Sequence, residues 1–142
     1  MPFEALGKNI MDEVLREFIN EGYKNLEFIE RDLSALQKQP DQLEPSIRLC
    51  RALHTIKGTS GMLGFPQVQK LTQAGESLLL GIRDKQVPFK PEHGEALLRL
   101  SALLENAFET IQQDGTDKGV DVESLTGELT GFLGSFSTKN TF

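Results

Sequence analysis

Apolar residues recur at steps of three and four along long segments of this chain, and this spacing constrains its fold more than any other feature. A step of that size is typical of a helix that buries one face. The stripes predict helices over about residues 8–38, from 42 or 45 to 63, 66–85 and 91–113, with a weaker fifth helix after Asp121. Long amphipathic helices joined by short loops favour an all-α fold, an antiparallel up-and-down four-helix bundle plus a short C-terminal fifth helix.

The stripes also predict which residues face the core. In the first helix the inward residues are Met11, Leu15, Phe18, Gly22, Leu26, Ile29, Leu33 and Leu36. Gly75 lies within the stripe of the third helix, where the missing side chain suggests a close helix–helix contact. In the fifth helix, Asp121 could cap the first turn, and the inward residues would be Val122, Leu125, Leu129, Phe132 and Leu133.

Length and composition limit the classes of protein to consider. A chain of 142 residues suits one domain, which we expect over residues 1–136, followed by a disordered tail at 137–142. A net charge of −6 disfavours a nucleic-acid partner, and single Cys50 excludes an internal disulfide. No apolar run approaches a membrane span, and no signal-peptide pattern begins the chain. We therefore expect a monomeric cytoplasmic domain.

The segment 51–65 carries features that packing alone does not require. On a helical projection His54 points away from the apolar face. Lys57 lies about 60° to one side of it and Arg51 about 60° to the other. Gly58 and Gly61 fall within about 40° of the histidine direction. The histidine is therefore predicted to project into solvent between two cations, on a face without large side chains.

Two interpretations of this face stay open. Each glycine inside a helix costs about 1 kcal/mol relative to alanine, so Gly58 and Gly61 could serve the close approach of another protein. Alternatively the helix frays there, since Gly64 before Phe65 and Pro66 is typical of a helix end. A lone histidine is also compatible with an inert surface residue. His93, which has no following lysine or glycines, is predicted to be a plain surface residue.

The twelve residues from His54 to Phe65, HTIKGTSGMLGF, resemble the phosphoacceptor motif of histidine-containing phosphotransfer (HPt) domains. The resemblance is strongest to the amino-terminal HPt domain of the chemotaxis histidine kinase CheA. It extends to residues 11–36, to QAGESLL at 73–79 and to residues 121–133. A run with histidine, lysine and glycines all in place is far more specific than an isolated HxxK.

The resemblance implies a role for each site residue. His54 would be the phosphoacceptor. Glu76, which spacing alone would assign to a solvated polar line, matches the family glutamate that hydrogen-bonds the imidazole. We predict that this bond holds the Nδ1–H, leaving Nε2 exposed as the nucleophile. Lys57 would neutralise phosphoryl oxygens, with Arg51 either assisting or simply solvated. Gln73 stands where many CheA-type domains carry a second histidine.

The partners implied are a histidine-kinase ATP-binding domain and a response-regulator receiver domain in a two-component system. The first would hold the ATP, and the second would supply Mg²⁺ and the acceptor aspartate, so the domain itself needs no cofactor or metal and is not expected to bind ATP. The glycines of GTSGMLG lack the GxxxxGK[ST] order of a phosphate-binding loop. Two other hypotheses are a helical adaptor that binds a receiver without transfer, and a metal-binding bundle using His54 and Glu76.

Overall fold

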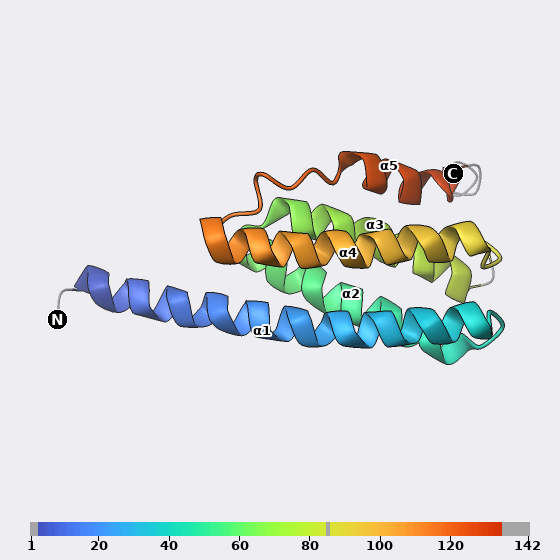
Figure 1. The fold of residues 1–142 in the computed structure, drawn as a ribbon, viewed down its shortest axis with the longest axis horizontal. Helices are drawn as coiled ribbons and strands as arrows, with labels where there is room; N and C mark the ends of the chain where they lie inside the picture. Colours follow the sequence, from blue (N-terminus) through green and yellow to red (C-terminus); the bar gives the residue numbers. More distant parts are fainter. Residues whose placement is uncertain (1–2, 85, 135–142) are drawn as a thin grey trace.

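The computed structural model describes residues 3–84 and 86–134, and every regular element in this part is a helix. The elements are α1 (Phe3–Lys38), α2 (Leu43–Leu63), α3 (Pro66–Arg83), α4 (Pro91–Asp114) and α5 (Glu123–Gly131). Helices α1 to α4 run alternately up and down, and each packs against two neighbours to close a four-helix bundle (Figure 1). The short α5 lies across α3 and α4. The predicted fold class is confirmed.

The turn between α2 and α3 is short because one of its residues favours the end of a helix and a later one favours the start of another. Gly64 adopts φ 80°, a left-handed conformation that favours glycine, and ends α2 as predicted. The next amide, of Phe65, donates to the carbonyl of Ser60 at 2.8 Å. Pro66 then opens α3, where its missing N–H costs nothing. This turn folds α3 back against α2 and so brings two helices of the site together.

The predicted core is largely observed. From Phe18 to Leu36 the stripe of α1 is buried, and so are the stripes of α3 and α4. Gly75 allows the close contact that its position suggests, because a Cβ there would lie 2.5 Å from Leu100 Cδ1 and 3.0 Å from Leu53 Cδ1. Gly22 similarly faces the ring of Phe108.

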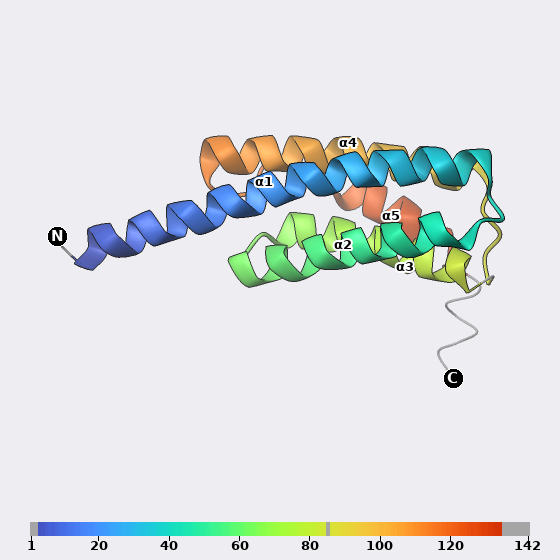
Figure 2. The same cartoon turned by 90° about the horizontal axis from the view of Figure 1, so that it is seen from below.

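The N-terminal part of α1 differs from the prediction. The helix begins at Phe3, five residues before the expected start, since Gly7 weakens a helix without breaking it. The expectation that Met11 faces the core is wrong, because its side chain is 59% exposed. Figures 1 and 2 show the reason: this end of α1 extends past the ends of the other helices, so no helix of the described residues packs on this part of the apolar stripe.

The prediction that His93 is a surface residue is also wrong. Its side chain is buried beside the rings of Phe89 and Phe132, at centroid distances of 6.3 and 4.5 Å. The Nδ1 atom accepts the backbone N–H of Lys90 at 3.1 Å at the start of α4. Burial lowers the pKa of His93 below its ordinary value, because the charged form is desolvated. His93 is therefore a packing and capping residue.

The linker before α5 is tied to the bundle by a buried carboxylate. Asp117 is fully buried, and its Oδ2 accepts the backbone N–H of Val68 in the first turn of α3 at 2.9 Å. At the next helix, Asp121 Oδ1 accepts the N–H of Glu123, the first residue of α5, at 3.1 Å, although the N-cap residue is Val122 and not Asp121 as predicted. The fifth helix therefore has a fixed start. Of its predicted inward residues, those up to Leu129 are buried, and the two that follow α5 are half-buried.

The structure leaves the predicted tail untested and bears on the prediction of membrane spans only for the described residues. The expected tail at 137–142 lies outside the described residues, so the extent of the domain over 1–136 stays a prediction. Within residues 3–84 and 86–134, no helix is both long enough and apolar enough to cross a membrane.

Alanine at Gly75 and at Gly58 should change stability in opposite directions. At Gly75 a Cβ overpacks the contact with two buried leucines, which costs about 1–3 kcal/mol and outweighs the gain in helix propensity. At Gly58 a Cβ meets nothing within 4 Å, so the same change should stabilise by up to about 1 kcal/mol. Urea denaturation of the two variants measures the difference. Equal shifts would contradict the helix contact inferred at Gly75.

Candidate functional site

His54 projects from the solvent face of α2. Its side chain is 70% exposed, while Leu49, Leu53 and Ile56 on the opposite side of the helix are buried in the core. This is the orientation predicted from the helical period. A large reacting group can therefore approach the imidazole without any movement of the bundle.

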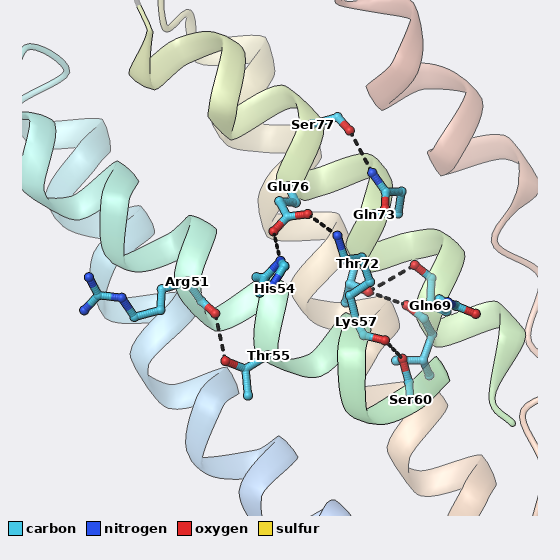
Figure 3. A network of polar contacts seen from close by, with 11 residues as sticks. Arg51, His54, Thr55, Lys57, Ser60, Gln69, Thr72, Gln73, Glu76 and Ser77 are labelled. Carbon is cyan, nitrogen blue, oxygen red and sulfur yellow. Dashed lines mark hydrogen bonds and ion pairs between the residues drawn. The ribbon is translucent and has the colours of Figure 1, made fainter. Parts of the chain in front are cut away.

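Glu76 of α3 lies directly behind the imidazole. Its Oε2 is 2.8 Å from His54 Nδ1, and its Oε1 is 2.6 Å from Lys57 Nζ (Figure 3). The carboxylate is buried, with 8% of its side chain exposed, and both of its oxygens have a partner. The position suggested by the resemblance is thus observed, and the solvated position suggested by spacing alone is not.

The contact with Glu76 favours one tautomer of His54. An ionised carboxylate only accepts hydrogen bonds, so the proton of the neutral imidazole lies on Nδ1, inferred from the partners. The Nε2 lone pair is then directed away from Glu76. An exposed unprotonated ring nitrogen is the arrangement that a nucleophilic histidine requires.

Lys57 lies one turn after His54, and its side chain is 22% exposed. We predicted a mobile charge directed at an incoming phosphoryl group. In this structure the ammonium is instead bound to Glu76, on the same carboxylate that holds His54 (Figure 3). Its effect on phosphoryl oxygens stays a prediction, which would require Nζ to leave or share the carboxylate.

The other candidate residues lie near His54, Lys57 and Glu76, but they are not part of this hydrogen-bonded group. Within the described part of the chain, no hydrogen bond or ion pair of the Arg51 side chain is observed; only its carbonyl accepts, from Thr55. The Gln73 amide donates to Ser77 and not to the imidazole. Gly58 faces open space, but a Cβ at Gly61 would lie 2.8 Å from Gln69 Nε2. Close packing against Gln69 is therefore one reason for a glycine at position 61. A role of Gly58 or Gly61 in docking stays a prediction.

Among the described residues, three or more histidine, cysteine, aspartate or glutamate side chains nowhere converge on a point that could hold a metal ion. Cys50 is buried, and desolvation raises the pKa of its thiol to about 11, so it is a poor ligand and nucleophile. The chemistry that the site supports is therefore that of an exposed imidazole oriented by a carboxylate.

Comparison with known proteins agrees with this geometry. Residues 13–125 match the Hpt domain family. The chain is 27% identical over 130 residues to the sensor histidine kinase CheAY of Helicobacter pylori and 29% identical over 119 residues to the chemotaxis protein CheA of Bacillus subtilis. It covers 16% and 18% of those proteins, while 92% and 84% of the chain are matched. It thus corresponds to a small part of each relative.

Two solved structures have the same fold. One is the phosphorylated P1 domain of CheA3 in complex with CheY6 from R. sphaeroides, with a TM-score of 0.76 and 32% identity over 84% of this chain and 94% of that chain. The other is the solution structure of the histidine phosphotransfer domain of CheA, with a TM-score of 0.79 and 25% identity over 86% and 92%. The family match over most of the chain shows that this protein belongs to the Hpt domain family.

Proposed function

We propose that this domain is a phosphotransfer module of a two-component system of the chemotaxis type, in which His54 carries the phosphoryl group. The observation that carries the proposal is the exposed imidazole with its Nδ1 2.8 Å from a buried carboxylate. A kinase catalytic domain would donate the group from ATP, and a receiver domain would accept it. The domain itself would neither bind nor hydrolyse ATP.

In the first step the Nε2 lone pair attacks the γ-phosphorus of ATP held by the kinase. A P–N bond forms, the bond to the bridging oxygen breaks, and ADP leaves. No proton has to leave Nε2, because the ring proton is on Nδ1. The ring gains positive charge as the bond forms, and Glu76 lies in contact to stabilise it.

In the second step a carboxylate oxygen of the receiver aspartate attacks the same phosphorus. The P–N bond breaks, a P–O bond forms, and the electron pair returns to Nε2. Apart from the P–N bond itself, such transfers depend mainly on positioning and on charge stabilisation. Mg²⁺ on the receiver would neutralise the phosphoryl oxygens, with Lys57 as the candidate cation on this side.

The experiment that tests this function is labelling with radioactive ATP and a purified CheA-type catalytic domain, followed by addition of a receiver. We expect label that is stable to alkali, labile to acid and lost to the receiver within the chase. A domain that binds the receiver but takes no label from an active kinase would be an adaptor. Acid-stable label would place the phosphoryl group on a hydroxyl side chain.

A further inference from the structure

A groove with charged residues in its wall lies between α1 and α2, and Ala52 and Thr55 also line it. Its volume is about 420 Å³, and three arginines line it, Arg31 from α1 with Arg48 and Arg51 from α2. Asp32 forms part of its wall. The three guanidinium groups and one carboxylate leave a net charge of +2 in a chain whose net charge is −6.

The three arginines are not equivalent. Arg48 donates from Nε and Nη2 to Asp32 Oδ1 at 3.0 and 2.9 Å, and Asp32 is buried, so this pair has a structural role. Arg31 lies over the ring of Phe28 at 5.1 Å, and no ion pair of its guanidinium is observed among the described residues. Arg51 makes no ion pair with the part of the chain that the structure describes. Two exposed cations are therefore available to an external anion.

The groove continues into a second hollow of opposite character. This hollow, of about 300 Å³, shares Asn25 and Thr55 with the first, and Phe18 and Met62 are among its apolar residues. Glu17 and Glu21 line it as well. The α1–α2 face is thus polarised along its length, acidic and apolar toward one end and cationic toward the other, with the residue next to His54 between the two.

We propose that the cationic end, formed by Arg31 and Arg51, is a docking surface for the acidic rim around the phosphoacceptor aspartate of a receiver domain. The inference rests on the proposed function. A receiver that holds Mg²⁺ does so through carboxylates, so anionic groups surround its acceptor. Arg51 is one turn, about 4.5 Å along the axis, from His54 and can meet them when the acceptor reaches the imidazole. The polarity of the groove then fixes the orientation of the partner.

The test is a double charge reversal, Arg31→Glu with Arg51→Glu, which leaves the Arg48–Asp32 ion pair intact. At low salt we expect binding of the unphosphorylated receiver and the kcat/KM of transfer to fall about tenfold, mostly through the association rate. At 0.5 M salt the difference should shrink, because exposed charges are then screened. Labelling of His54 by the kinase should fall by a smaller factor than binding of the receiver. Lys118→Glu in the α4–α5 linker, which makes the −2 charge change of one of the two reversals, is the control for net charge.

Three results would overturn the proposal. Unchanged receiver binding would show that the arginines are only solvated. A selective loss of labelling by the kinase would assign the groove to the nucleotide-bearing partner instead. An equal loss with Lys118→Glu would indicate a general effect of net charge. Because receiver binding is measured without phosphate, a failure of His54 to accept label would affect the proposed function and not this assignment.

Discussion

Replacement of His54 by glutamine is expected to reduce labelling by the kinase to background. Glutamine keeps a polar side chain near Glu76 but has no ring nitrogen with a basic lone pair, so the P–N bond cannot form. The fold should be unaffected, because the His54 side chain is 70% exposed and its one observed hydrogen bond is to Glu76. Surface changes of this kind shift the free energy of unfolding by about 0.5 kcal/mol.

The second histidine is the matched control. His93→Gln should lower the thermal midpoint, since it removes a buried ring and disturbs the start of α4. Labelling of its folded fraction should equal that of the wild type. Both variants are compared as label per folded molecule, with the folded fraction measured by circular dichroism. Persistent alkali-stable label in His54→Gln would remove His54 from the mechanism.

Much of this arrangement follows from periodicity alone. The steps of three and four place the helices within a few residues of their observed bounds, and the position of His54 opposite the buried face of α2 is a direct consequence of the helical period. The end of α2 at Gly64 and the start of α3 at Pro66 also follow from the sequence. Glycine readily adopts the left-handed conformation of a helix end, and proline fits the first turn of a helix. These features are local, and a single helix determines them.

The features that the sequence prediction missed depend on how one helix lies on another. Gln69, Gln73 and Glu76 form one polar line on α3, yet only Glu76 is buried, because α2 covers that part of the line. Periodicity could not show this, and only the family resemblance indicated it. Met11 is the opposite case: it belongs to the apolar stripe of α1, but no helix among the described residues covers it.

The burial of His93, in contrast, could have been predicted from its spacing. It lies four residues before Leu97 and seven before Leu100, on the buried stripe of α4. This spacing predicts burial, whereas the missing lysine and glycines bear only on its chemistry. Asp117 gave no such signal, because its burial comes from a linker contact with the start of α3.

Replacement of Glu76 by glutamine is expected to slow phosphorylation of His54 about ten- to hundredfold, and to slow it more than alanine does. The Lys57 ammonium only donates, so it takes the amide oxygen of the new side chain. The amide NH₂ then faces His54 Nδ1 and favours the tautomer with the proton on Nε2, which blocks the nucleophile. A wrong tautomer costs about 10⁴-fold in a buried Ser-His-Asp triad. The exposed ring of His54 can reorient in water, so a smaller loss is expected here.

This mechanism predicts a rescue that a merely structural role for Glu76 would not give. With Lys57→Met added, the glutamine oxygen is free to accept the Nδ1–H, so Glu76→Gln should slow the reaction less in the Lys57→Met background than in the wild type. Nitrogen-15 shifts of the His54 ring report the tautomer directly, without any kinase. We expect the Nδ1–H form in the wild type, mainly the Nε2–H form in Glu76→Gln, and a return toward Nδ1–H in the double variant. If the ring shifts of Glu76→Gln match those of the wild type, the carboxylate does not set the tautomer and its contact with His54 is only structural.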